Sequence, residues 1–104
     1  MYTFIEARSF DRAREVYLDD DEYAELQMFM MDHPAAGDVV PKSGGVRKLR
    51  WQRKGQGKRG GLRIVYFVRY HPQEFWMLTL YAKAKVDDIP GHILKQLKEA
   101  FENE

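Results

Sequence analysis

The sequence contains no cysteine and no long apolar run, and each absence excludes a class of protein. Without cysteine, the chain can build neither a disulfide framework nor a thiolate metal site. The longest apolar run, residues 75–82, is far too short to cross a bilayer, so no membrane partner is expected. The first residues lack a basic segment followed by an apolar stretch, which predicts no signal peptide, and the lack of cysteine fits a reducing cytosol. No cluster of His, Asp or Glu has metal-ligand spacing, so no metal or other cofactor is expected.

Acidic residues are missing from the middle of the chain. Residues 39–73 contain ten Lys or Arg and no Asp or Glu, whereas residues 1–38 contain three basic and ten acidic residues. Residues 74–104 contain four basic and six acidic residues, so the formal net charge of +1 conceals a strongly basic middle. Charge separated in this way creates a field that attracts polyanions, of which nucleic acid is the usual one. The alternative is a solvated surface whose charges cluster by chance, and the length of the acid-free segment makes that alternative weak.

Apolar and aromatic residues are plentiful. The 104 residues are 44% hydrophobic and include two Trp, six Phe and six Tyr. This composition is sufficient for one hydrophobic core, so we predict a single domain over residues 1–104.

Hydrophobic periodicity and turn residues predict the elements of this domain. A short strand over residues 2–6 is followed by a helix over residues 10–18, with Ser9 or Asp11 at its start. Asp19 and Glu22 have the spacing of a capping box, which begins a second helix. The rest of the chain is predicted to form a loop, three strands and a C-terminal helix, over residues 32–45, 46–51, 61–70, 75–83 and 87–101.

The order β-α-α-β-β-β-α defines the fold class. Three consecutive strands with short turns favour an antiparallel meander, and the first two helices are expected to form a hairpin on one face of the sheet. We therefore predict an α+β fold with a mostly antiparallel sheet, a helical hairpin and a C-terminal helix. The apolar face of that last helix is predicted to consist of Ile93, Leu94, Leu97, Ala100 and Phe101.

Alternation along the strands assigns side chains to the two faces of the sheet. The face toward the helical hairpin is predicted to carry Leu49, Trp51, Leu62, Ile64, Tyr66, Val68, Trp76, Leu78, Leu80 and Ala82. The opposite face is predicted to carry a cationic group with aromatic and apolar neighbours, consisting of Lys48, Arg50, Arg63, Phe67, Phe75, Met77, Tyr81 and Lys83, with Lys85 just beyond. Phosphates bind Arg and Lys, and bases stack on flat rings, so this face is a candidate RNA site. The alternative is that these cations lie over a half-exposed sheet and bind nothing.

A basic, glycine-rich loop over residues 52–60 would add contacts to an RNA backbone, although a solvated hairpin tip is an equal alternative for Lys54 and Lys58. The residues predicted to bind RNA outside the central cationic group are Arg47, Arg53, Lys54, Lys58, Arg59 and Lys85.

Four short motifs resemble those of bacterial toxins of the RelE/HigB type. They are residues 46–51 (VRKLRW), 57–61 (GKRGG), 63–66 (RIVY) and 80–83 (LYAK), and the loop 32–41 is also similar. The resemblance covers nearly the whole chain and includes the order of its elements. It implies a RelE-like fold and a cytoplasmic, metal-independent endoribonuclease that cleaves mRNA on the ribosome. It also implies a cognate helix-turn-helix antitoxin, with operator DNA bound only through the toxin–antitoxin complex.

The resemblance assigns the catalytic cations to Lys48, Arg50, Arg63 and Lys83, or less closely Lys85. The implied reaction is attack of a ribose 2′-OH on the adjacent phosphate, which leaves a 2′,3′-cyclic phosphate and a 5′-OH. Arginines suit the phosphate because a guanidinium holds two oxygens. Lys48, Lys83, Tyr81 and His92 are candidates for proton transfer. Residues 86–90 lack the Tyr or His that some relatives carry near the last helix, which leaves the general base open.

Two other functions compete with the ribonuclease. The first is a toxin of the same fold that inhibits DNA gyrase without cleaving RNA. The second is a non-catalytic module whose basic face binds single-stranded RNA. Cleavage of messages on translating ribosomes, inhibition of supercoiling and simple RNA binding distinguish the three.

Overall fold

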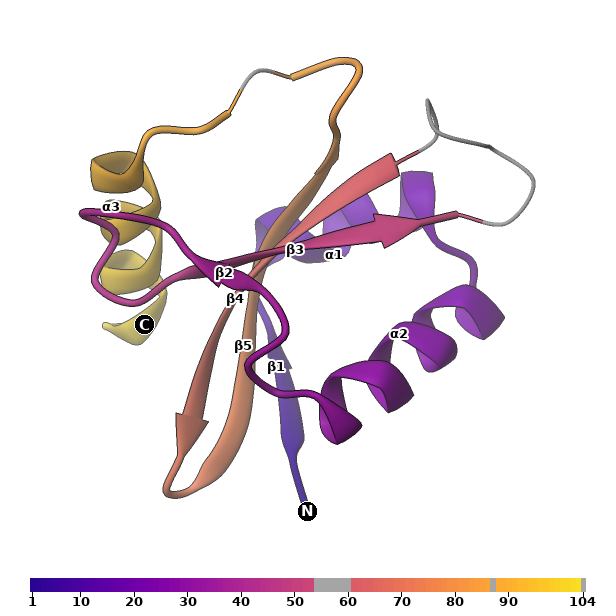
Figure 1. Ribbon diagram of the computed structural model, residues 1–104, viewed down its shortest axis with the longest axis horizontal. Helices are drawn as coiled ribbons and strands as arrows, with labels where there is room; N and C mark the ends of the chain where they lie inside the picture. The colour runs from indigo at the N-terminus through magenta and orange to yellow at the C-terminus, as the bar shows by residue number, and fades with distance from the viewer. Residues whose placement is uncertain (54–60, 87, 104) are drawn as a thin grey trace.

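The computed structural model describes residues 1–53, 61–86 and 88–103, and these residues form a sheet with helices on both sides (Figure 1). The elements in chain order are β1 (Thr3–Glu6), α1 (Arg8–Tyr17), α2 (Asp20–Asp32), β2 (Asp38–Val39), β3 (Arg47–Gln52), β4 (Gly61–Tyr70), β5 (Gln73–Ala82) and α3 (Gly91–Glu102). None of the described helices has the length and apolar character needed to span a bilayer.

The sheet has five strands in the order β1-β5-β4-β3-β2. Strands β3, β4 and β5 form the predicted antiparallel meander, and β1 pairs in parallel with β5 at one edge. The predicted α+β class and the mostly antiparallel sheet are confirmed. Strand β2, which pairs with β3 at the other edge, lies in the segment 32–45 that was predicted to be a loop. A strand of two residues is too short to produce a pattern of alternation.

The first two helices follow directly from β1 and are joined by Leu18 and Asp19. The predicted capping box is present, since Glu22 N donates to Asp19 Oδ1 at 2.7 Å and Asp19 N donates to Glu22 Oε1 at 3.3 Å. Helix α1 starts earlier than predicted, and its N-cap is Ala7, which makes no side-chain capping bond. The Ser9 hydroxyl instead donates to the carbonyl of Leu78 and thereby ties α1 to β5.

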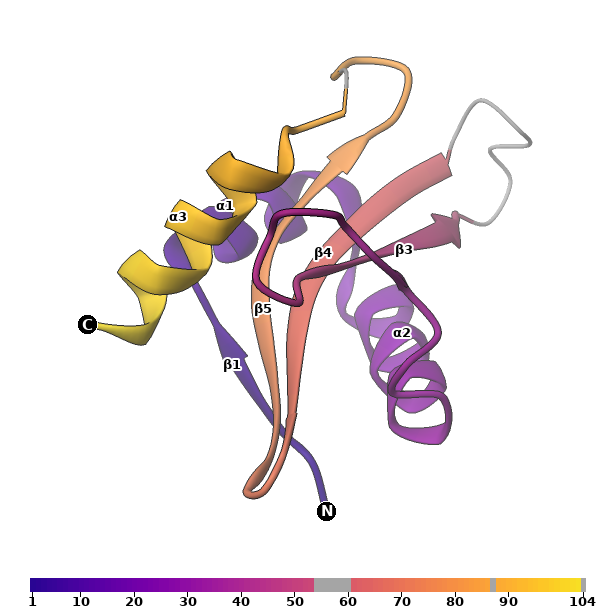
Figure 2. The same cartoon turned by 60° about the vertical axis from the view of Figure 1, so that its left-hand side comes forward.

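The main core lies between α1, α2 and one face of the sheet. It consists of buried side chains from all of these elements, namely Phe10, Leu18, Tyr23, Leu26, Met30, Leu49, Leu62, Ile64, Tyr66, Val68, Phe75, Met77, Leu80 and Ala82. A second cluster forms where α3 packs on the opposite face, and it consists of Val46, Val65, Trp76, Leu78, Tyr81 and Leu94. Figure 2 shows the two sides, with α3 in front of β5 and α1 behind it.

A β-bulge divides β5 into two stretches of opposite alternation. Val65 pairs with Thr79, whereas the next residue of β4, Tyr66, pairs with Met77, so Leu78 is an extra residue in β5. The predicted faces are therefore correct for Leu80, Ala82 and Tyr81 but wrong for the residues before the bulge. Since side chains alternate, one inserted residue moves every earlier side chain to the other face.

The bulge corrects four predicted positions. Phe75 and Met77 were expected on the open cationic face, but both are fully buried in the core beneath α1 and α2. Trp76 and Leu78 were expected in that core, but they belong to the cluster beneath α3. The cationic face is consequently less apolar than the sequence predicted.

Helix α3 covers only part of its face of the sheet. Leu94 is buried, and Leu97 and Phe101 pack partly against the cluster around it. Ile93 is 42% exposed and Ala100 is also exposed, so the predicted apolar face was too wide. The part of this face that α3 leaves open is the region of the cationic side chains.

Candidate active site

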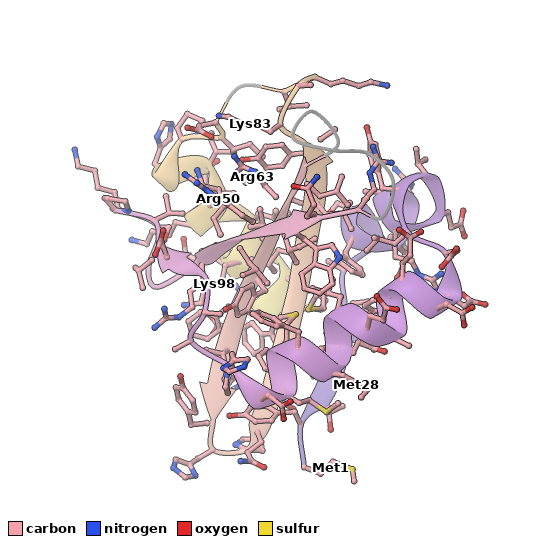
Figure 3. All side chains as sticks on the ribbon, turned by 45° about the vertical axis from the view of Figure 1, so that its right-hand side comes forward. Met1, Met28, Arg50, Arg63, Lys83 and Lys98 are labelled. Atoms are coloured by element: carbon pink, nitrogen blue, oxygen red, sulfur yellow. The ribbon has the colours of Figure 1, made fainter. Side chains whose placement is uncertain are left out.

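The open part of the face is a cleft of about 470 Å³. It is lined by residues of β2, β3 and β4 and of the segments beside them, which are Ala36, Asp38, Val39, Val40, Pro41, Lys48, Leu49, Arg50, Arg63, Lys83 and Asp88. Four predicted catalytic residues, Lys48, Arg50, Arg63 and Lys83, line this one cleft. Figure 3 shows Arg50, Arg63 and Lys83 gathered at one end of the sheet. The predicted convergence of these cations is confirmed.

Two arginines lie near this end of the sheet, and we call Arg50 and Arg63 the arginine pair. They are directly opposite each other on β3 and β4. Among the described residues, neither forms an ion pair with an acid, and Arg63 donates only a long bond of 3.3 Å to the carbonyl of Leu62. Like charges directly opposite each other in a sheet are destabilising, so this arrangement favours an anion that binds both guanidiniums.

Two lysines also line the cleft, and we call Lys48 and Lys83 the lysine pair. Lys48 Nζ lies 3.2 Å from Asp88 Oδ1, and Lys83 Nζ lies 2.9 Å from the same oxygen. Hydrogen bonds from Lys83 and then Lys48 lower the pKa of Asp88, so this carboxyl group is ionised at neutral pH. The two ammonium groups therefore share one carboxylate oxygen.

Asp88 was not predicted as a member of the site. The sequence suggested only that it helps to start the last helix, but α3 begins at Gly91 with Pro90 as its N-cap. Asp88 lies in the segment between β5 and α3, and it reaches Lys83, five residues earlier, and Lys48 on β3. The only signal in the sequence was that Asp88 follows Lys83 by five residues. That spacing did not indicate the contact with Lys48.

Tyr81 lies beside the arginine pair but beneath the surface. It is opposite Arg63 on β5, its side chain is only 6% exposed, and it packs in the cluster under α3. Its hydroxyl is buried and has no hydrogen-bond partner among the described residues. Burial raises the pKa of Tyr81, with a further increase from Asp88 and an opposing effect from Arg63. The ring has no open face for the base stacking that the sequence suggested.

The wall of the cleft opposite the strands is held by a buried tyrosine. The Tyr66 hydroxyl donates to the carbonyl of Pro34 at 2.9 Å and accepts from Gly37 N at 3.0 Å. A Cβ at Gly37 would lie 2.9 Å from the Tyr66 ring, so only glycine fits this close approach. These contacts fix the segment that leads into β2 and the cleft lining.

The same wall is held from the other side by α3. A Cβ at Gly91 would lie 1.9 Å from the carbonyl oxygen of Pro41, so the start of α3 is in close contact with the cleft wall. Lys98 Nζ donates to the carbonyl of Gly44 at 3.1 Å and lies 4.0 Å from the centre of the Phe67 ring. Helix α3 thus both covers the second core and positions the loop between β2 and β3.

Two of the arginines predicted to bind RNA are engaged elsewhere. Arg47 Nη1 donates to the carbonyls of Gly37 at 2.7 Å and Ala35 at 3.2 Å, so it supports the cleft wall. The guanidinium of Arg53 lies 5.5 Å from the centre of the Tyr17 ring, next to α1. Neither residue lines the cleft.

The remaining predicted contacts lie at or beyond the edge of the site. Lys85 is exposed and follows β5, but it is not part of the cleft lining. His92 is exposed on α3 and does not line the cleft either. Lys54, Lys58 and Arg59 lie outside the described residues.

The lining defines what the cleft can bind. It contains four cationic and two acidic side chains, a formal net charge of +2, in a hollow shaped by three strands of one sheet. Such a site fits a phosphate group whose oxygens accept several charge-assisted hydrogen bonds. Within the described part of the chain, no group of His, Cys, Asp or Glu is arranged to hold a metal ion. No protein-family model matches the sequence.

Proposed function

We propose that this protein is a toxin of the RelE/HigB type, a ribosome-dependent endoribonuclease that cleaves mRNA and is held inactive by a cognate antitoxin. The observation that carries the proposal is the convergence of Lys48, Arg50, Arg63 and Lys83 in one cleft. Two arginines without an acidic partner among the described residues, with two lysines beside them, match the needs of a phosphodiester under attack.

The absence of a hydroxyl, thiol or imidazole nucleophile in the described lining favours a substrate that carries its own nucleophile. The lining residues include no hydroxyl, thiol or imidazole group, and the nearby Tyr81 hydroxyl is buried. A substrate that brings its own nucleophile removes this difficulty. RNA does so, because its ribose 2′-OH is adjacent to the scissile phosphate.

In the proposed reaction, the arginine pair binds the non-bridging oxygens of the scissile phosphate. The guanidiniums stay charged at every physiological pH and stabilise the extra negative charge that develops when the 2′ oxygen attacks. Holding the phosphate between β3 and β4 also orients the 2′-OH in line with the leaving 5′ oxygen, which is a contribution of positioning.

The lysine pair is assigned to the leaving group. Its ammonium groups line the same cleft as the arginine pair and would donate a proton to the departing 5′ oxygen. The bond between phosphorus and the 5′ oxygen breaks as the bond to the 2′ oxygen forms. The 2′-OH gives up its proton to a water molecule, and the departing 5′ oxygen takes one from an ammonium group of the lysine pair, so the products are a 2′,3′-cyclic phosphate and a 5′-OH.

The proposed partners follow from the same charge. Ribosomal RNA and mRNA are polyanions, and the cleft would attract them by long-range electrostatics. A cognate antitoxin would cover the cleft with an acidic or amphipathic segment while the cell grows. Phe75 and Met77 are buried, so this partner surface depends on charge more than the sequence suggested.

Primer extension on messages from a purified translation system tests the proposal. We expect wild-type protein to cut within coding regions only when ribosomes translate, and Arg63→Ala to lower the cleavage rate by at least about 100-fold, as expected for a lost transition-state donor. Arg69→Ala is the matched control, because Arg69 lies on the same strand but contacts Glu74 at 4.0 Å and the Trp76 ring.

Other outcomes would contradict the proposal. Intact messages together with inhibited DNA supercoiling would identify a gyrase toxin instead. Tight RNA binding without cleavage, whether or not ribosomes translate the message, would identify a binding module. Equal cleavage by wild type and Arg63→Ala would remove the arginine pair from the reaction.

A further inference from the structure

The lysine pair already binds an anion in the free protein. Both ammonium nitrogens lie within hydrogen-bond distance of a single oxygen, Asp88 Oδ1, at 2.9 and 3.2 Å. Charge-assisted bonds of this kind are the ones that an RNA phosphate oxygen would make to the same two donors. The carboxylate thus has the position and the charge of a ligand.

Asp88 is also placed so that it can leave. It belongs to the segment between β5 and α3, and its side chain is 58% exposed. Moving the side chain into solvent would bury no charge and, among the described residues, would break only the two ion pairs with Lys48 and Lys83. Exposed ion pairs contribute little to stability, so a phosphate can replace this carboxylate at small cost.

We propose that Asp88 is an internal competitor for the RNA phosphate, so that RNA must displace its carboxylate from the lysine pair before the cleft is filled. This inference rests on the proposed function for the identity of the ligand. Its consequence is that the free protein binds RNA weakly, and that the cleft fills where RNA is held at high local concentration, as on a translating ribosome.

A second carboxylate supplies a matched control. Asp38 is exposed and lines the same cleft, but within the described residues it forms no ion pair with a cation. Asp38→Asn and Asp88→Asn change the net charge of the cleft equally. A difference between them therefore measures occupation of the lysine pair and not general electrostatics.

The experiment measures binding of a fluorescent, single-stranded 2′-O-methyl oligoribonucleotide by anisotropy, so that cleavage cannot occur. We expect Asp88→Asn to bind about three- to tenfold more tightly than wild type, since two screened ion pairs no longer compete. Asp38→Asn should change the affinity by no more than about twofold, as expected for a screened rim charge. In a Lys48→Gln, Lys83→Gln background, the gain from Asp88→Asn should disappear.

Equal gains for the two Asn variants would overturn the inference, because charge alone would explain them. Unchanged or weaker binding by Asp88→Asn would also overturn it, and would indicate that the carboxylate positions the lysines for RNA. Thermal melting of each variant confirms that the fold is intact. The binding assay uses no ribosomes, so its result stands apart from the cleavage test, and a protein that fails to cut mRNA can still show the competition.

Discussion

The arginine pair and the lysine pair belong to one cleft but differ in their partners. Arg50 and Arg63 are opposite each other on adjacent strands and, within the described residues, have no acidic partner. Lys48 and Lys83 share the carboxylate of Asp88. The difference indicates that one half of the cleft is ready for an anion, whereas the other half has to exchange one.

The largest expected effect is on the rate of mRNA cleavage, when a residue of the arginine pair is replaced. Two replacements of Arg50 distinguish the role of its charge from that of its planar guanidinium. Arg50→Ala should lower the rate of mRNA cleavage on ribosomes by about 100-fold or more, because a transition-state donor is lost. Arg50→Lys keeps the charge but loses the planar fork, so it should recover only part of this loss. The rates are measured by primer extension at saturating ribosome concentration.

The reciprocal exchange in the lysine pair provides the control. Lys48→Arg retains a cation beside Asp88, and its cleavage rate should fall less than that of Arg50→Lys. If both exchanges had the same effect, the two pairs would be equivalent and the proposed division of roles would be wrong.

A second prediction concerns the wall that the two pairs face. Gly91→Ala would place a Cβ 1.9 Å from the Pro41 carbonyl oxygen, so backbone must shift. We expect the free energy of unfolding to fall by about 1–3 kcal/mol, the usual cost of an overpacked contact. Urea denaturation followed by circular dichroism measures this change.

The neighbouring residue supplies the comparison for that variant. His92 is exposed in the first turn of α3, and His92→Ala should alter stability by less than about 0.5 kcal/mol. A Gly91→Ala protein as stable as wild type would show that α3 does not hold the cleft wall in the way described.

The smallest expected effect is that of the Tyr81 hydroxyl. Because burial raises the pKa of Tyr81, the phenol is a neutral donor at neutral pH, and in the described residues it has no acceptor. Tyr81→Phe should leave stability unchanged or raise it by up to about 1 kcal/mol, since an unsatisfied buried group is removed. We expect its cleavage rate to stay close to that of wild type.

Cleavage by Tyr81→Phe also tests the role assigned to Tyr81 from the sequence. A large loss of cleavage with retained stability would show that the hydroxyl takes part in proton transfer. Such a result would also mean that the cluster under α3 opens when RNA binds.

Much of this architecture was accessible from the sequence because strong local signals agreed with the fold. The limits of β4 match the prediction, and the capping box at Asp19 is present. Alternation along β3 and β4 correctly placed Lys48, Arg50 and Arg63 on one face, which was enough to predict the cleft.

The parts that escaped prediction depend on long-range contacts. The bulge at Leu78 is visible only in the pairing of β4 with β5. Asp88 joins the site through a bond to Lys48, which is forty residues away in sequence. Arg47 lies in the same basic segment as Lys48 and Arg50, but its guanidinium donates hydrogen bonds to the carbonyls of residues 35 and 37. No local pattern distinguishes such an arginine from one that binds RNA.

The extra residue in β5 has a consequence for how this strand tolerates mutation. Before Leu78, the buried positions beneath α1 and α2 have odd numbers, 75 and 77. After Leu78, the buried positions on the same face have even numbers, 80 and 82. A profile of polar substitutions along the strand should therefore change phase at Leu78. Deleting that single residue would give a regular ladder in which Phe75, Met77, Leu80 and Ala82 alternate in phase on the same face, and the cluster under α3 would lose a buried leucine.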